Sequence, residues 1–238
     1  MWSPVRLDQR ECQDEVQDRL DLDPGRLMQA LRGLQRINAW SGAARIFWQP
    51  LASLMRQTGG AELSILDLGC GAGDQLIALC QRAAQRGWKL HATGCDRNPK
   101  TLEYARQQAD RAGVSVRFFP LDLPQESIPD RYDVVICSLL LHHMQDEQVV
   151  PFLEAMGGAA RQMVMVNDLR RSATGWWLAY WGTRLLGCGP VNRVDSLLSV
   201  QAALTLSEAR VFVQHSGWTG ATIQAHWPCR YLITWRKP

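Results

Sequence analysis

The sequence predicts an α/β fold built on a mostly parallel sheet that is covered by helices on both faces. From residue 64 onward, short apolar segments alternate with stretches of helical periodicity, which is the order typical of such a fold. A second observation is the glycine-containing stretch ILDLGCGAGD (65–74), which follows the first apolar segment and precedes a helical one. Since ligands bind at the carboxyl ends of parallel strands, this stretch is expected to form a binding loop.

The individual elements follow in a regular order. Strands are predicted at 64–69, 89–96, 114–122, 132–141 and 161–169, with helices at 74–86, 99–113 and 146–160 between them. Two final segments, 218–227 and 229–238, are separated only by Pro228, so they must form an antiparallel hairpin.

The domain organisation follows from a change of pattern near residue 60. Residues 1–60 are predicted to form an N-terminal helical cover, with Asp23 as a helix cap and Pro24 in the first turn. Residues 61–238 form the main domain, in which the alternation is interrupted at about 170–205 by an aromatic insert.

Composition excludes several classes of protein. The 238 residues are 46% hydrophobic with a net charge of +3, and Lys and Arg are scattered, which argues against a nucleic-acid partner. No apolar run approaches the ~20 residues of a membrane span, so no stable membrane insertion is expected. The first residues lack the order of a signal peptide, and seven single cysteines are typical of reduced thiols. We expect a cytoplasmic protein of unknown oligomeric state.

Carboxylates near the glycine loop indicate its ligand. A phosphate loop is excluded because no Gly-Lys-Ser/Thr follows, and the spacing is G-x-G-x-G rather than that of a dinucleotide site. Asp67, two positions before the first glycine, disfavours phosphates and suits a cation. Asp96 ends the next strand, where a carboxylate accepts both ribose hydroxyls, and Asp122 follows the third strand near a possible adenine. A ligand with an ammonium, a ribose and an adenine but no phosphate is S-adenosylmethionine.

Four stretches, ILDLGCGAGD, GCDRNPKTLEYAR, PLDLP and YDVVICSLLLHHM, resemble the motifs of class I S-adenosylmethionine-dependent methyltransferases in order and spacing. The resemblance implies a Rossmann-like, seven-stranded sheet whose last strand is antiparallel. It also implies a cofactor site along the strand ends, formed by Asp67, Gly69, Cys70, Gly71, Gly73, Asp96, Arg97, Asp122, Leu123 and Ser138. Within the family, LHHM, VNDLRRS and LQRINAWSG look most like bacterial methyltransferases of small quinone, phenolic or polyketide molecules.

Plainer interpretations exist for these residues. The glycines alone could form a tight strand-to-helix turn, and Asp122 could be a loop or capping residue. Cys70 and Cys95 fit as small buried fillers whose backbone matters more than their sulfur.

His142 and His143 follow the fourth predicted strand, at the edge where an acceptor should lie. Imidazole titrates near neutral pH, which suits a general base that removes a hydroxyl proton, and His143 is preferred because it lies further from the buried strand. One histidine could instead pack under the sheet edge or cap the next helix. A metal site is the competitor, but Ser138 stands where metal-dependent relatives carry a carboxylate, and Asn167-Asp168 reverses their Asp-Asn pair. We therefore predict no metal.

The insert carries an aromatic stripe. Trp177, Tyr180, Trp181 and Arg184 recur at three- and four-residue spacing, so they share one helix face. This face is interpreted as a lid over an apolar acceptor. The predicted substrate contacts are Trp40, Asn167, Trp177 and Trp181. The alternatives are packing onto the sheet and contact with a lipid surface.

Together these features predict methyl transfer to a hydroxyl oxygen of a hydrophobic, phenolic small molecule. The alternatives are carbon methylation of a quinone-like ring, nucleic-acid methylation and non-catalytic cofactor binding. SLLLHHM lacks the Pro-Pro-aromatic motif of many base-amino methyltransferases.

Overall fold

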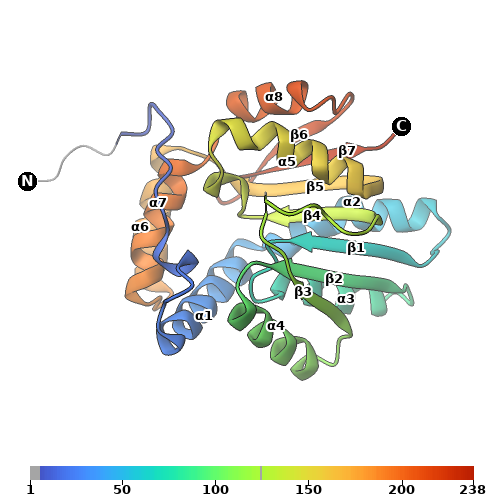
Figure 1. Ribbon diagram of the computed structural model, residues 1–238, viewed down its shortest axis with the longest axis horizontal. Coiled ribbons are helices and arrows are strands. Elements are labelled where there is room, and N and C mark those ends of the chain that lie inside the picture. The colour runs from blue at the N-terminus through green and yellow to red at the C-terminus, as the bar shows by residue number, and fades with distance from the viewer. Residues whose placement is uncertain (1–5, 124) are drawn as a thin grey trace, which may run out of the picture.

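The computed structural model describes residues 6–123 and 125–238, and within them seven strands form one sheet (Figure 1). The strand order is β3-β2-β1-β4-β5-β7-β6. Strand β7 runs antiparallel to both β5 and β6, while the pairs among β1 to β5 are parallel. The strands are β1 (Leu63–Leu68), β2 (Leu90–Asp96), β3 (Val116–Pro120), β4 (Tyr132–Ser138), β5 (Ala160–Leu169), β6 (Thr222–His226) and β7 (Arg230–Arg236). The predicted sheet, with its reversed last strand and closing hairpin, is confirmed.

Helices cover both faces of this sheet, as Figure 1 shows. They are α1 (Pro24–Ser41), α2 (Ala43–Gln57), α3 (Asp74–Ala84), α4 (Pro99–Arg111), α5 (Asp146–Ala159), α6 (Ala173–Leu185), α7 (Pro190–Ala202) and α8 (Leu206–His215). Two short 3-10 turns, η1 (Val16–Asp18) and η2 (Leu141–His143), complete the elements that matter for the site. In the described part of the chain, no helix is long and apolar enough to cross a bilayer.

The core explains why the strands are continuously apolar. In β4, Val134 and Ile136 pack with α2 and α3, whereas Val135 and Cys137 pack on the opposite face with α5 and α8. A strand buried on both sides has no polar face, so its sequence does not alternate.

The first 60 residues divide between two roles. Helix α2 packs on the sheet through residues such as Phe47, Leu51 and Met55, which are fully buried with β1 and α3. Helix α1 instead packs against α6 and α7 beyond the carboxyl ends of the strands (Figure 1). The two helices part at Gly42, whose φ of 64° places it in the left-handed region.

Strand β4 ends three residues earlier than predicted. Ser138 is its last residue, and Leu139 follows with a φ of 58°. This backbone is costly for a branched side chain, and the Leu139 amide donates to the Asn167 carbonyl at 2.9 Å, which holds the turn against β5. The turn carries the chain out of the sheet, and both histidines, which are expected after the strand, lie in η2.

Candidate active site

A cavity of about 630 Å³ lies at the carboxyl ends of the parallel strands. Its floor is the glycine loop after β1, and its sides come from the ends of β2 and β4, from α1, and from α6 and α7. The N-terminal segment, residues 6–23, passes across it and contributes lining residues between Cys12 and Arg19 (Figure 1). The expected binding loop therefore forms the floor of this cavity.

The glycine loop presents bare backbone to this cavity. Gly69, Gly71 and Gly73 all have positive φ, between 52° and 73°, where a side chain is strained. A Cβ at Gly73 would lie 3.1 Å from Phe118 Cζ, so this glycine packs inward against β3. The Gly71 amide donates to Asp96 Oδ2 at 3.0 Å, which ties the loop to the end of β2.

Three carboxylates meet at the floor of the cavity. Asp67 is 1% exposed, and neither of its carboxylate oxygens has a hydrogen-bond partner among the described residues. Burial, with the charges of Asp74 and Asp96, raises the pKa of Asp67 well above its usual range. Burial also raises the pKa of Asp74 and of Asp96, although both accept hydrogen bonds, from Asn38 and from the Gly71 and Asn98 amides. Such a floor suits a cationic group and repels phosphate.

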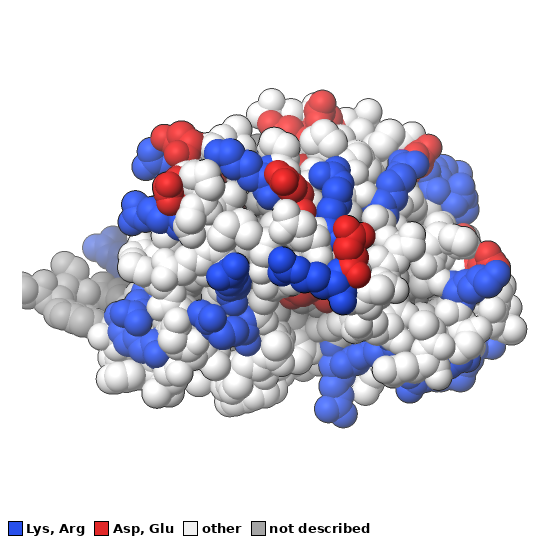
Figure 2. Space-filling model, turned by 90° about the horizontal axis from the view of Figure 1, so that it is seen from below, with Lys and Arg blue, Asp and Glu red and all other residues white. Residues whose placement is uncertain are grey.

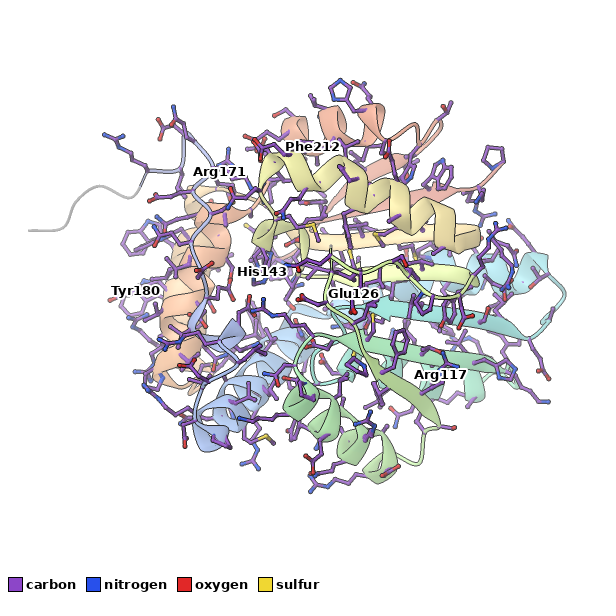
Figure 3. The ribbon with its side chains drawn as sticks, viewed as in Figure 1. Arg117, Glu126, His143, Arg171, Tyr180 and Phe212 are labelled. Atoms are coloured by element: carbon purple, nitrogen blue, oxygen red, sulfur yellow. The ribbon has the colours of Figure 1, made fainter. Side chains whose placement is uncertain are left out.

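Most residues of the predicted cofactor site line this cavity. They are Asp67, Gly69, Cys70, Gly71, Asp96, Arg97, Asp122, Leu123 and Ser138, and Gly73 alone of the set does not. Asp122 is exposed, and its amide donates to Glu126, which lies in the loop between β3 and β4 and is labelled in Figure 3. Asp96 on the floor is thus held by backbone hydrogen bonds, whereas Asp122 lies at the exposed edge of the cavity.

His142 is held between two carboxylates. Its Nδ1 lies 2.7 Å from Asp168 Oδ1, its Nε2 lies 3.5 Å from Glu15 Oε1, and the side chain is 3% exposed. Burial alone would lower the pKa of His142, but the charges of Asp168 and Glu15 and the hydrogen bonds to them raise it to about 10. At neutral pH this imidazole is protonated and cannot accept a proton. The structure therefore argues against His142 as a general base. The sequence gave no sign that two acidic side chains would lie beside it.

His143 has a different environment. Its side chain is 24% exposed, lines the cavity and points toward the space between the strand ends and α6 (Figure 3). Nδ1 lies 2.9 Å from Asp18 Oδ2 in η1. A carboxylate on one nitrogen fixes the ring and leaves Nε2 to meet an acceptor, which is the arrangement expected of an oriented base.

Glu15, His142 and His143 also form a group whose candidate ligand atoms lie within 4.8 Å of one another. The donor types would suit a transition metal. However, Asp168 and Glu15 raise the pKa of His142, which favours an imidazolium with protons on both nitrogens, and an imidazolium cannot ligate a metal. Absence of a metal requirement stays a prediction.

The structure places the predicted substrate contacts in different environments. Trp40 lines the cavity. Asn167 is fully buried and does not line it; its amide oxygen is best placed toward Ser138 Oγ and Arg230 Nη1, and its nitrogen toward the Tyr231 carbonyl. It therefore joins β4, β5 and β7 rather than touching an acceptor.

Trp177 and Trp181 lie on the outer face of α6 and are 51% and 56% exposed. The inner face, which lines the cavity, carries Gly175, Leu178, Ala179, Gly182, Thr183 and Leu186. The interpretation of these tryptophans as a lid is thus wrong, because the face of α6 that lines the cavity lies about half a helical turn away from them. Both faces of α6 are apolar, so periodicity could not choose between them.

The sequence predicts a helical cover over residues 1–60, but it did not reveal the contacts of residues 6–23, which contain only the short turn η1. Arg10 donates to Ala202 O and to Leu141 O and pairs with Asp146, while Asp195 accepts from the Val16 and Gln17 amides. Arg171, labelled in Figure 3, donates to the Leu7 carbonyl. The only sequence signal was the partly acidic composition of this stretch, which says nothing of its partners.

The sheet with its reversed strand, and the glycine loop between Asp67 and Asp96, have the arrangement that the resemblance to class I methyltransferases implies. More particularly, residues 65–162, from β1 to the start of β5, match the family described as "Methyltransferase domain".

Named relatives share part of the chain. It is 29% identical over 139 residues to a ubiquinone biosynthesis O-methyltransferase of Serratia proteamaculans, covering 56% of this chain and 54% of that protein. It is 31% identical over 126 residues to the protein of that name from Aeromonas salmonicida, covering 51% and 50%. The chain thus spans about half the length of the curated relatives it matches.

Solved structures show the same fold. Magnesium protoporphyrin IX methyltransferase from Synechocystis PCC 6803, with bound S-adenosylmethionine, aligns with a TM-score of 0.59 at 16% identity, over 91% of this chain and 98% of that one. Human N-acetylserotonin methyltransferase, in complex with S-adenosylmethionine, aligns with a TM-score of 0.62 at 17% identity, over 90% and 56%.

Proposed function

We propose that the protein is an S-adenosylmethionine-dependent methyltransferase that acts on a hydroxyl oxygen of a hydrophobic, phenolic small molecule. The observation that carries the proposal is Asp67, a buried carboxylate with no hydrogen-bond partner among the described residues, at the floor of a cavity with Asp74 and Asp96. A buried carboxylate without a partner is costly, and a cationic ligand that pairs with it removes that cost.

The residues present fit this cofactor. Asp67 would meet its cationic methionine end, the positive-φ glycines let backbone approach it, and Asp96 at the end of β2 would accept the ribose hydroxyls. When bound, the cofactor supplies a methyl group on an activated sulfonium.

The chain's own contribution is alignment and removal of a proton. His143, oriented by Asp18, is the group proposed to take the proton of the acceptor hydroxyl at Nε2. Helices α1, α6 and α7 with the N-terminal segment form the proposed cover, which excludes water from the cavity.

The acceptor class is supported by the cavity wall. Leu34, Ile37, Leu178, Ala179, Leu186 and Val200 line its covered side. An apolar wall suits an aromatic molecule. The names of the relatives favour a ring of the kind methylated on oxygen in quinone biosynthesis, so a quinone precursor is the second candidate. All seven cysteines are free thiols, which supports an intracellular location.

The test combines cofactor binding with transfer. Calorimetry should show binding of S-adenosylhomocysteine but not NADH, and Asp67→Asn should weaken it roughly tenfold to a hundredfold. Asp110→Asn, the same change at an exposed position on α4, is the matched control and should bind normally.

Two further measurements complete the test. Because the pKa of Asp67 is raised and only its ionised form pairs with a cation, affinity should increase as pH rises and fall on acidification. Methyl-labelled cofactor with phenols, quinone precursors and oligonucleotides then identifies the acceptor. Labelling of oligonucleotides alone would overturn the proposal.

A further inference from the structure

Helix α6 carries an exposed apolar stripe on its outer face. Trp177, Trp181 and Leu185 follow one another at four-residue spacing and are 51%, 56% and 84% exposed. Tyr180 stacks under Arg184, whose guanidinium lies 3.6 Å from the ring centre, and both tryptophans make edge contacts with the same tyrosine. Figure 3 shows Tyr180 on the side of α6 that faces away from the sheet. The rings are thus held outward by one another.

Two more exposed tryptophans lie at the same end of the molecule. Trp40, at the end of α1, is 51% exposed, and Trp227, in the turn between β6 and β7, is 70% exposed. The turn reaches the start of α6, since a Cβ at Gly175 would lie 3.3 Å from Cys229 Cβ. Among the tryptophans of the described residues, four are therefore exposed around one end of the sheet.

The helices that carry Trp40, Trp177 and Trp181 are basic, while the N-terminal segment that packs on α7 adds exposed acidic residues, among them Asp14 and Asp21. Residues 24–41 contain three arginines and residues 169–194 contain four, and neither segment contains Asp or Glu. Arg32, Arg36 and Arg193 are exposed, and α1 and α7 bring them together, because Asn192 donates to the Ala30 carbonyl. Figure 2 shows basic side chains separated by uncharged surface at its lower left, over the end that holds α1 and α6.

We propose that this end of the molecule is a docking face for the surface of a membrane that contains anionic phospholipids. The docking face consists of Trp40, Trp177, Trp181, Leu185 and Trp227 with Arg32, Arg36 and Arg193. Indole rings favour the boundary between headgroups and acyl chains, and arginines favour anionic headgroups. The attachment is peripheral, in keeping with the lack of a spanning helix among the described residues.

The charges favour a membrane over the other possible occupants. A two-fold pair of this chain would bring the same arginines face to face, which opposes association. Nucleic acid requires many phosphate contacts and gains little from apolar surface such as Leu185. An anionic bilayer matches both the cations and the exposed rings.

The position of the docking face adds a route for the acceptor. Trp40 belongs to it and also lines the cavity, and α6 presents one face to each. A hydrophobic molecule dissolved in the bilayer would therefore reach the cavity without crossing water. This route rests on the proposed function, whereas docking itself does not.

Vesicle flotation tests the docking. The full chain should float with vesicles of phosphatidylcholine and phosphatidylglycerol in equal parts, and bind pure phosphatidylcholine much less. Trp177→Ser with Trp181→Ser should lower the partition coefficient roughly tenfold or more, and each of Arg32→Glu and Arg193→Glu roughly fivefold or more. Val211→Ser removes an equally exposed apolar side chain from α8, and should change nothing.

Controls separate docking from folding and from the enzyme's activity. The double serine variant should unfold at the normal temperature and bind S-adenosylhomocysteine normally, because both side chains are exposed and outside the cavity lining. Equal binding to neutral and anionic vesicles, or undiminished binding by these variants, overturns the proposal. So does light scattering that shows a dimer which Trp181→Ser dissociates, or oligonucleotide binding without vesicle binding. Vesicle binding by a chain that transfers no methyl group would overturn only the proposed function.

Discussion

The two halves of the cavity are built by different means. The floor is made by backbone, since the ends of β1, β2 and β4 place Asp67, Asp96 and Ser138 through the sheet, and the glycine loop closes over them. The cover is made by side chains from segments far apart in sequence, such as Glu15 with His142 and Arg10 with Asp146. The strands of the sheet therefore fix the positions of the side chains on the floor. The cover depends instead on individual ion pairs, which are sensitive to single substitutions and to pH.

His143 provides the sharpest test, because it lies where floor and cover meet. If it is the base, His143→Gln should lower turnover by roughly 10²–10⁴-fold while cofactor affinity is kept. Equal turnover by the two enzymes at pH 6 would reduce His143 to a positioning residue.

His142 tests whether the cover is held by charge. His142→Gln leaves Asp168 and Glu15 buried without their cation, and should cost about 3–5 kcal/mol in the free energy of unfolding measured with denaturant. His91→Gln is the control, because His91 pairs with Glu62 on the surface and should cost less than about 1 kcal/mol.

The pH dependence of stability follows from the pKa of His142, which is raised to about 10. The contribution of His142 to the free energy of unfolding is complete below its pKa in the unfolded chain, about 6.5, and is lost as pH rises toward about 10. Stability should therefore fall between these pH values in the normal protein and fall less in His142→Gln. Parallel curves for the two would show that the ion pair does not hold the cover.

Asp96 tests the floor alone. Asp96→Ala removes the acceptor for the Gly71 amide and for the ribose hydroxyls, and should weaken S-adenosylhomocysteine binding by about 1–3 kcal/mol. Unchanged affinity, or tight NADH binding, would contradict the assignment of the floor.

Chelation should have the smallest effect. Exhaustive treatment with EDTA should leave turnover unchanged, because His142 is held as a cation between Asp168 and Glu15. Loss of activity that magnesium or zinc restores would instead assign a metal to Glu15, His142 and His143.

The floor could be predicted from sequence because its rules are local. A carboxylate two residues before a glycine loop, and another at the end of the next strand, are placed by strand register alone. The cover follows no such rule. Asn167, near the end of β5, looked available to an acceptor, but the sheet buries it against β7. Helix α6 has two apolar faces, and the sequence could not say which of them turns toward the cavity. Glu15 reaches His142 across more than a hundred residues, and nothing periodic marks that contact.

The N-terminal segment sets a kinetic condition on turnover. Residues between Cys12 and Arg19 line the cavity, and Arg10, Glu15 and Asp18 fasten the segment to η2 and α5. We expect a bound product to leave only when these contacts open, and the frequency of that opening would then set an upper limit on the catalytic cycle. Asp18 also orients His143. Each such opening would therefore separate the proposed base from the carboxylate that orients it, and each closure would restore that contact.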